Sequence, residues 1–151
     1  MTCQKTIALV RSIIHGMEAG PDSFASTVLK SARVIDARPG WCRVEIIVQN
    51  NLGNMTGTMH GGATATLVDI LTTCALMTTE SGRPGVSVDL NLSYLRGVPI
   101  GRSIVIDSNV DRQGRSLAFT SALIKLKATE ADNVGEDKIA VIARHTKAFP
   151  K

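Results

Sequence analysis

The sequence predicts an α+β domain in which one curved antiparallel sheet of about six strands wraps around a single long central helix. Three observations support this prediction. A helix from about Gly61 to Thr79 would be apolar on nearly all sides, so it has to be surrounded. From Val86 onward apolar residues alternate with period two, and further strand-like segments follow with short turns between them. The chain has 151 residues, the size of one ordinary domain, so we expect residues 1–151 to form a single domain.

The first element is expected to be an amphipathic helix over about residues 3–17. Its apolar residues share one helical face: Ile7, Val10, Ile13, Ile14 and Met17. No acidic residue precedes Glu18, and this pattern also resembles a weak mitochondrial transit peptide. Because only Lys5 and Arg11 are basic, packing of the helix on the domain or its neighbour is the favoured interpretation. The stretch Pro21-Asp-Ser-Phe-Ala25 then predicts a short helical turn, with Pro and Asp as start signals.

Two strands and a loop are expected before the long helix. The apolar segments 34–35 and 44–48 flank Ala37-Arg-Pro-Gly40, which predicts a hairpin turn. A polar loop from Gln49 to Met59 leads into the helix, and Gly82-Arg-Pro-Gly85 ends it.

Four strands are expected after the long helix. In the first, apolar residues from Val86 to Tyr94 alternate with polar ones, which predicts a strand buried on one side. Three more strands are expected near residues 102–111, 115–128 and 137–148. The turn Arg112-Gln-Gly-Arg115 and the polar loop from Thr129 to Glu136 separate them.

Composition excludes several classes of protein. The net charge is +4, but Lys and Arg are scattered and only 3% of residues are aromatic, so no nucleic-acid partner is expected. A basic surplus suits a small polyanionic ligand such as a nucleotide-tagged thiol, or simply a solvated basic surface. No secretory signal is present, and the apolar run at 63–79 contains an aspartate and several threonines, so no transmembrane segment is expected.

The cysteines give information about compartment and metal binding. Cys3, Cys42 and Cys74 are odd in number and lack C-x-x-C spacing, which predicts neither a disulfide framework nor a metal site. This usage fits a reducing compartment. We therefore expect a cytoplasmic location, with the mitochondrion as the alternative that the N-terminal segment leaves open.

Candidate functional residues gather around the start of the long helix. A helix N-terminus carries unpaired N–H groups and a partial positive charge, so the N–H groups of Gly61 and Gly62 are candidates to stabilise an oxyanion. The two glycines could instead simply ease packing. His60 could hydrogen-bond a substrate carbonyl or fix the loop. Asp69 is a carboxylate in a mostly apolar helix, which makes it a candidate general base, or a buried group satisfied by its neighbours.

Helix geometry limits how these groups can cooperate. At 1.5 Å per residue, Asp69 lies about 12 Å along the helix from Gly61. A base must come within about 3 Å of the water that it activates. If both groups serve one reaction, they come from different copies of the chain. The sequence therefore predicts a homo-oligomer with sites between subunits, and we expect a dimer of dimers.

Several longer motifs resemble one known family. They are Asn54-Met-Thr-Gly-Thr-Met-His-Gly-Gly62 followed by Thr66-Leu-Val-Asp69, Pro84-Gly-Val-Ser-Val-Asp-Leu-Asn-Leu-Ser-Tyr94, Gly114-Arg-Ser-Leu-Ala-Phe-Thr-Ser121 and Arg144-His-Thr-Lys147. Together they resemble the hotdog-fold acyl-CoA thioesterases, and within them the phenylacetyl-CoA thioesterase-like branch. The resemblance spans about residues 5–149 and is strongest in the long helix and the strand after it.

The resemblance implies a role for five residues. Asn54 and Ser87 match residues that help to hold the attacking water in this family. His60 matches a histidine that orients the thioester end of the ligand, and Gly61 matches a glycine whose N–H binds the carbonyl oxygen. Asp69 matches an aspartate of the partner subunit that activates the water or attacks directly.

The implied function is hydrolysis of medium- and long-chain fatty acyl-CoA, or alternatively aryl-acyl-CoA, to free acid and coenzyme A. No metal or cofactor is expected, because coenzyme A is part of the substrate. The alternatives are a non-catalytic acyl-CoA-binding or regulatory hotdog protein and, less favoured, a hotdog hydratase or dehydratase. Basic residues at strand ends, Arg96, Arg144 and Lys147, are expected to bind the CoA phosphates.

Overall fold

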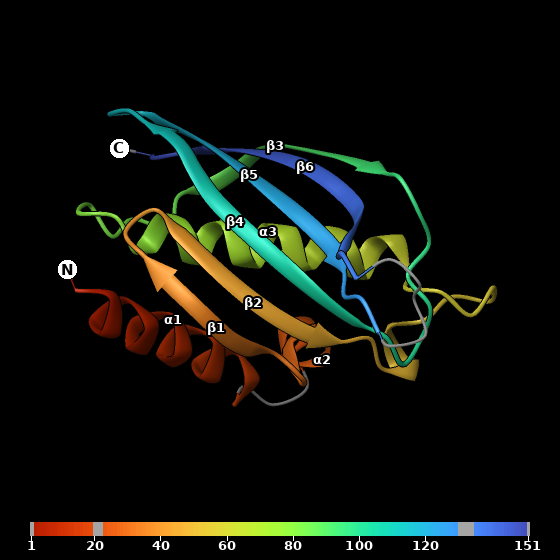
Figure 1. The fold of residues 1–151 in the computed structure, drawn as a ribbon. Helices are drawn as coiled ribbons and strands as arrows, with labels where there is room; N and C mark the ends of the chain where they lie inside the picture. Colours follow the sequence, from red (N-terminus) through yellow and green to blue (C-terminus); the bar gives the residue numbers. More distant parts are fainter. Residues whose placement is uncertain (1, 20–22, 130–134, 151) are drawn as a thin grey trace.

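Six antiparallel strands form one sheet that curves around helix α3 in the computed structural model, which describes residues 2–19, 23–129 and 135–150 (Figure 1). The helices are α1 (Cys3–Glu18), α2 (Phe24–Leu29), the short 3₁₀ helix η1 (Asn50–Leu52) and α3 (Gly61–Met77). The strands are β1 (Arg33–Arg38), β2 (Trp41–Ile47), β3 (Val86–Tyr94), β4 (Ser103–Gln113), β5 (Leu117–Leu126) and β6 (Lys138–Ala148). Their order across the sheet is β1-β2-β4-β5-β6-β3, with every neighbouring pair antiparallel. The predicted α+β architecture is confirmed.

Helix α3 is buried on most of its sides, as its sequence predicts. Its buried residues are Ala63, Thr64, Leu67, Val68, Ile70, Leu71, Thr72, Cys74, Ala75 and Leu76. They pack mainly against β4, with further contacts to β2 and β5. The helix begins at Gly61 as expected and ends at Met77, two residues before the expected Thr79. Asp69 is its one charged residue.

The N-terminal helix packs on the domain. Helix α1 buries Val10 and Ile14 and contacts β1 and α2. The amphipathic helix is expected over about residues 3–17, and α1 spans Cys3–Glu18. The short helix α2 begins after Ser23, whose Oγ accepts a hydrogen bond from Ser26 N at 3.0 Å. The expected start signals, Pro21 and Asp22, lie outside the described residues.

The remaining strands follow the predicted order. The β1–β2 hairpin turns at Gly40, whose φ of 77° is the left-handed conformation that glycine adopts readily. Strands β4, β5 and β6 lie within a few residues of their predicted bounds. Most of the loop expected between β5 and β6, residues 130–134, lies outside the described part. Among the described residues, no helix has both the length and the apolar character needed to cross a membrane.

Strand β3 differs from its prediction. It was expected to be buried on one side, yet Val88 is 60% exposed and Tyr94 54% exposed. The burial prediction is wrong for the single chain because β3 lies at the edge of the sheet, where it pairs only with β6 and has few contacts with α3 (Figure 1). An apolar edge strand left in water is a site for pairing with another chain.

Candidate active site

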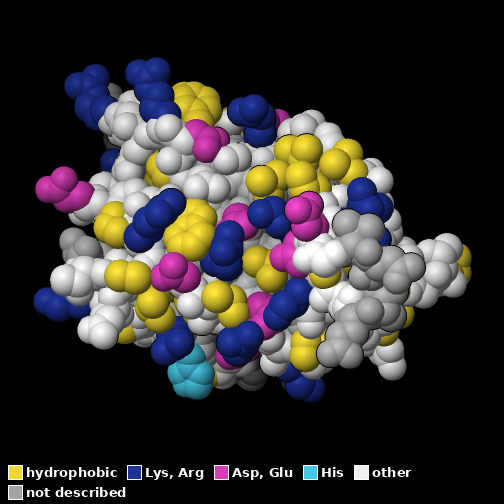
Figure 2. All heavy atoms as spheres, in the orientation of Figure 1, with side chains coloured by type: hydrophobic (Ala, Val, Ile, Leu, Met, Phe, Trp, Pro, Cys, Tyr) yellow, Lys and Arg dark blue, Asp and Glu magenta, His cyan; other side chains and the backbone are white. Residues whose placement is uncertain are grey.

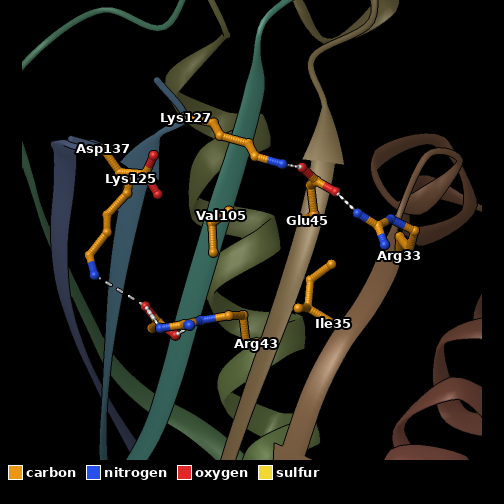
Figure 3. Close-up of a pocket in the computed structure, with 9 residues that line it drawn as sticks. Arg33, Ile35, Arg43, Glu45, Val105, Lys125, Lys127 and Asp137 are labelled. Atoms are coloured by element: carbon orange, nitrogen blue, oxygen red, sulfur yellow. Dashed lines mark hydrogen bonds and ion pairs between the residues drawn. The ribbon is translucent and has the colours of Figure 1, made fainter. Parts of the chain in front are cut away.

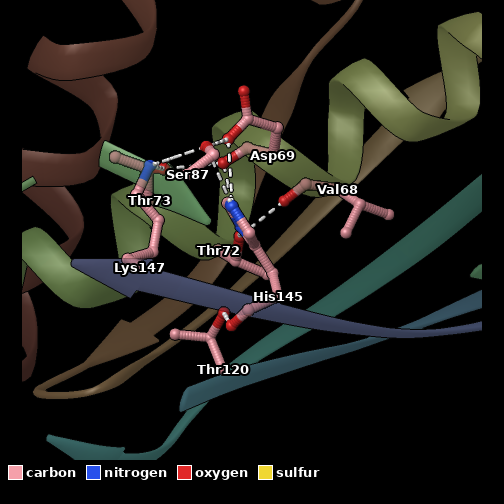
Figure 4. A network of polar contacts seen from close by, with 8 residues as sticks. All are labelled: Val68, Asp69, Thr72, Thr73, Ser87, Thr120, His145 and Lys147. Atoms are coloured by element: carbon pink, nitrogen blue, oxygen red, sulfur yellow. Dashed lines mark hydrogen bonds and ion pairs between the residues drawn. The ribbon is translucent and has the colours of Figure 1, made fainter. Parts of the chain in front are cut away.

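Asp69 projects from α3 toward the inner face of β3 and β6 (Figure 4). Its carboxylate is 44% exposed, although most of the helix around it is buried. Ser87 Oγ, on β3, lies 3.0 Å from Asp69 Oδ1. A bulge after Ser87 shifts the register of β3 against β6. The structure therefore brings together two of the predicted site residues, a carboxylate and a hydroxyl, in a partly solvated position.

Two residues of β6 complete this cluster. His145 Nε2 lies 3.0 Å from Ser87 Oγ and 3.5 Å from Asp69 Oδ1. On its other side, His145 Nδ1 lies 2.7 Å from Thr72 Oγ1. Lys147 Nζ lies 3.6 Å from Asp69 Oδ1. The cluster therefore joins α3, β3 and β6 through polar contacts.

Burial sets the charge state of the histidine. His145 is only 1% exposed. Loss of hydration lowers the pKa of His145, and the nearby charge of Lys147 lowers it further, while Asp69 and Asp89 oppose the shift. At neutral pH the imidazole is consequently uncharged.

Lys147 is buried, whereas a side chain that binds a CoA phosphate is expected to be exposed to solvent. It is 4% exposed, and its Nζ donates a hydrogen bond to Thr73 Oγ1 at 2.8 Å. Its phosphate-binding role stays a prediction, and its observed partners are Thr73 and the carboxylate of Asp69.

Three predicted residues lie at the N-terminus of α3. His60 is the N-cap of the helix, and its Nδ1 accepts a hydrogen bond from Gly62 N at 2.9 Å. A Cβ on Gly62 would lie 3.1 Å from the same nitrogen, so glycine leaves room for the cap. The N–H of Gly62 is therefore occupied by His60, and Gly61 is the remaining candidate of the glycine pair.

A hollow of about 300 Å³ lies beside this helix end. Gly61, Asn54, Tyr94 and Arg96 are among the residues that line it. The hydroxyl of Tyr94 donates a hydrogen bond to the carbonyl oxygen of Gly61 at 2.9 Å. Arg96 Nε donates to the carbonyl oxygen of Ile139 at 2.7 Å, which fixes the guanidinium group of this lining residue.

The Asn54 side chain makes local hydrogen bonds. Its Oδ1 accepts from Thr56 N at 3.0 Å, and its Nδ2 donates to Thr58 Oγ1 at 3.0 Å. These bonds are typical of a turn-forming asparagine. In the single chain Asn54 thus stabilises its loop while facing the hollow beside Gly61.

The predicted residues therefore form two groups at different places along α3. Asp69 and Ser87 belong to one group, and Asn54, His60 and Gly61 to the other, about 12 Å away along the helix axis. Arg96 lies with the second group. Arg144 belongs to neither group, because it is exposed on β6 and its neighbour His145 is the one that faces α3.

Sequence reasoning did not single out His145 as a site residue. Strand parity could have done so, because Ala143, His145 and Lys147 alternate on the inner face of β6. Two ionisable residues at consecutive inward positions of a predicted strand indicate a polar cluster inside the sheet.

A second charged cluster lies on the outer face of the sheet, where basic and acidic side chains are interleaved with apolar ones (Figure 2). Its hollow of about 420 Å³ lies over four strands (Figure 3). Glu45 pairs with Lys127 and Arg33, and Asp107 pairs with Arg43 and Lys125. The hydrogen bond from Lys127 is the main reason why the pKa of Glu45 is lowered, with Arg33 adding to the effect against the opposing influence of burial.

These ion pairs connect neighbouring strands, so the charged side chains that line this hollow are explained by their role in holding the sheet together. Within residues 2–19, 23–129 and 135–150, no group of three or more His, Cys, Asp or Glu side chains is arranged to hold a metal ion.

Comparison with known proteins identifies the family. Residues 56–130 match the family described as the thioesterase superfamily. Acyl-coenzyme A thioesterases from mammals are up to 44% identical to this chain, with 81% of their own length covered. The chain belongs to the thioesterase superfamily, and it is a thioester hydrolase.

Individual relatives and solved structures show how far the similarity extends. Acyl-coenzyme A thioesterase 13 of Homo sapiens is 44% identical over 120 residues, which cover 80% of this chain and 81% of that protein. Among solved structures, zebra fish thioesterase superfamily member 2 has a TM-score of 0.84 and 38% identity, covering 95% of this chain and 98% of that one. The same protein from Mus musculus has a TM-score of 0.76 and 33% identity, covering 99% and 100%. The predicted hotdog fold and the predicted family resemblance are both confirmed.

Proposed function

We propose that this chain hydrolyses the CoA thioesters of medium- and long-chain fatty acids at sites shared between two copies of the chain. The chain is an acyl-CoA thioester hydrolase, as its family membership and its relatives indicate. The observation that carries the site assignment is Asp69, a half-exposed carboxylate on a buried helix with the Ser87 hydroxyl 3.0 Å away. Such a carboxylate is suited to remove a proton from water.

The proposed chemistry needs few groups. Asp69 takes one proton from a water molecule held with the help of Ser87, and the water oxygen forms a bond to the thioester carbonyl carbon. Negative charge then develops on the carbonyl oxygen, where the N–H of Gly61 and the positive end of α3 stabilise it. When the carbonyl re-forms, the carbon–sulfur bond breaks and the electron pair leaves with the CoA thiolate. Asn54 and His60 would hold the water and the thioester end in place, and no step requires a metal or another cofactor.

Two features support a site made from two chains. The first is the distance along α3, because Asp69 and Gly61 lie about 12 Å apart in one copy. The second is the uncovered edge of β3, with Val88 60% exposed. Ser87 lies near one end of β3, and Tyr94, which contacts Gly61, lies at the other. Antiparallel pairing of β3 with its copy about a two-fold axis would therefore bring the Asp69–Ser87 end of one chain to the Gly61–Tyr94 end of the other.

The same assembly supports the choice of substrate. Pairing of two β3 strands would gather their apolar side chains, including Leu90 and Leu92, into a surface that suits an alkyl chain, or an aryl group as the alternative. Arg96 lines the hollow and is the best-placed candidate for a CoA phosphate, whereas Arg144 and Lys147 stay weaker candidates. A second pairing of such dimers would give the dimer of dimers. The cytoplasmic location, with the mitochondrion as its alternative, stays a prediction.

Steady-state hydrolysis of a chain-length series of acyl-CoAs, followed by thiol release, tests this proposal. Saturated C8 to C18 substrates are expected to give the highest kcat/KM, and phenylacetyl-CoA tests the aryl alternative. Asp69→Asn is expected to lower kcat by about 10²–10⁴-fold. Asp111→Asn is the matched control, because Asp111 is an exposed carboxylate on β4, and full activity is expected. Tight binding of acyl-CoA without turnover would instead favour the non-catalytic binding protein.

A further inference from the structure

The hydroxyl of Ser87 faces two acceptors but has one proton. Its Oγ lies 3.0 Å from Asp69 Oδ1 and 3.0 Å from His145 Nε2 (Figure 4). Lys147 Nζ, at 3.5 Å, can donate to the same oxygen. A hydroxyl donates one hydrogen bond at a time, so Ser87 donates either to the carboxylate or to the imidazole.

Thr72 determines which nitrogen of His145 carries the proton when the ring is neutral. Thr72 Oγ1 lies 2.7 Å from the carbonyl oxygen of Val68, and a carbonyl oxygen can only accept. The Thr72 proton is used in that bond, so Thr72 Oγ1 accepts from His145 Nδ1–H at 2.7 Å. The neutral ring then presents the lone pair of Nε2 to Ser87.

We propose that His145 is a positioning residue whose proton decides the direction of the Ser87 hydroxyl and so the availability of Asp69 as a base. With neutral His145, the Ser87 O–H donates to Nε2, and Asp69 Oδ1 can accept a proton from water. With protonated His145, Nε2–H donates to Ser87 Oγ, and the Ser87 O–H turns to Asp69 and occupies the basic lone pair. This inference rests on the proposed role of Asp69.

The surroundings of His145 favour the neutral ring in the working enzyme. The charged groups that act on it are Asp69 on α3 and Lys147 on its own strand, together with the more distant charge of the exposed Asp89 on β3. Burial, followed by Lys147, lowers the pKa of His145 and outweighs the two carboxylates. From β5, the uncharged Thr120 donates a hydrogen bond from its Oγ1 to the backbone carbonyl oxygen of His145 at 2.9 Å. Hydrolysis is therefore expected to run with His145 uncharged and to fall as acid protonates it.

The first test identifies the tautomer of His145 by its NMR signals and does not depend on catalytic activity. The chain has three histidines, so a long-range ¹⁵N–¹H imidazole spectrum of the full-length protein is simple. His145→Gln identifies the His145 signals by their disappearance. We expect Nδ1 to be protonated and Nε2 to be unprotonated near neutral pH. An Nε2–H tautomer would overturn the inference whatever the activity of the enzyme.

The second test is the pH dependence of kcat. In the wild type, kcat is expected to fall on acidification at the pH where the His145 signals titrate. His145→Gln offers Ser87 an amide oxygen that accepts but does not titrate, so this step should disappear while activity far above that of Asp69→Asn remains. Thr72→Val frees the ring and should lower kcat, whereas Thr72→Ser keeps the hydroxyl and should restore it.

The outcomes separate the two proposals. An unchanged acidic step in folded His145→Gln would overturn the role of His145 and leave Asp69 as the base. Full activity of Asp69→Asn would instead refute the proposed hydrolytic site, even if the tautomer proved to be as expected.

Discussion

Complementation between two inactive variants is the strictest test of a site shared by two chains. The first variant is Asp69→Asn, which keeps the shape of the side chain but removes the base. The second is Gly61→Pro, which removes the N–H group proposed to bind the oxyanion. Gly61 is the first residue of α3, a position where proline is favoured, and His60 has φ −64° and ψ 134°, which a residue before proline adopts readily.

Local space also allows the proline variant to fold. A Cβ at Gly61 would meet the Tyr94 hydroxyl oxygen at 3.4 Å, the lower limit of an ordinary contact. The Cβ of the proline is therefore accommodated, and we expect the unfolding midpoint, which also tests the rest of the ring, to stay close to that of the wild type.

The expected magnitude follows from counting sites. Every dimer has two sites, each with Gly61 from one chain and Asp69 from the other. Random pairing of equal amounts makes about half of the dimers mixed, and each mixed dimer has one intact site, so about one quarter of wild-type activity should return. Each parent should retain about 1% or less, because losing the base or one oxyanion donor costs at least about 10²-fold. Mixing should thus raise activity by about 25-fold or more.

The assay uses two affinity tags so that mixed dimers can be isolated after joint refolding, with thiol release as the readout. Asp69→Asn chains mixed with differently tagged Asp69→Asn chains are the control, and these should stay inactive. If isolated, folded mixed dimers are no more active than their parents, the two groups do not serve a shared site and the reasoning from helix length fails.

Three further predictions concern the edge strand, pH and thiols. Val88→Glu should place a charge in the proposed β3–β3 pairing, so light scattering should show smaller particles and hydrolysis should fall; an intact, active oligomer would contradict this. The hydrogen bond from Lys127 is the main reason why the pKa of Glu45 lies below its ordinary value. The Glu45 carboxylate should therefore stabilise the fold at pH values above the ordinary glutamate pKa, and this stabilisation should be lost as pH falls through the lowered pKa. The difference in unfolding free energy between wild type and Glu45→Gln should therefore shrink on acidification, and a constant difference would refute it. A disulfide reagent should label Cys3 in the native protein and spare the two buried thiols, one of which, Cys74, has its pKa raised to about 12 by burial; rapid native labelling of all three would contradict the buried positions.

The fold was predictable because its main signals are local. A helix that is apolar on nearly all sides has to be enclosed, and the alternation after Val86 distinguishes strand from helix without any knowledge of contacts. The burial of β3 was not predictable by the same means. Alternation shows that one side of a strand is apolar, but it does not show whether α3 or another chain covers that side.

The candidate site was predictable in part. Asp69 and Gly61 stand out because a charge in an apolar helix and glycines at a helix start can be recognised from the order of residues alone. The partnership of Ser87 with His145 depends on β6 lying next to β3, a pairing between strands that are distant in the sequence. The use of the Gly62 N–H by His60 depends on a side-chain rotamer, which the sequence does not specify.

The strand order has a consequence for how the chain folds during its synthesis on the ribosome. Strand β3 is made in the middle of synthesis, but its partner within the chain is β6, the last strand to emerge. Until residues 138–148 leave the ribosome, β3 has both edges open, and Ser87 has not met His145 or Lys147. Pairing between residues so far apart is slow, because a long loop must close first. The candidate site cluster can therefore form only after β6 has emerged, and until then the nascent chain exposes both edges of an apolar strand to neighbouring polypeptides.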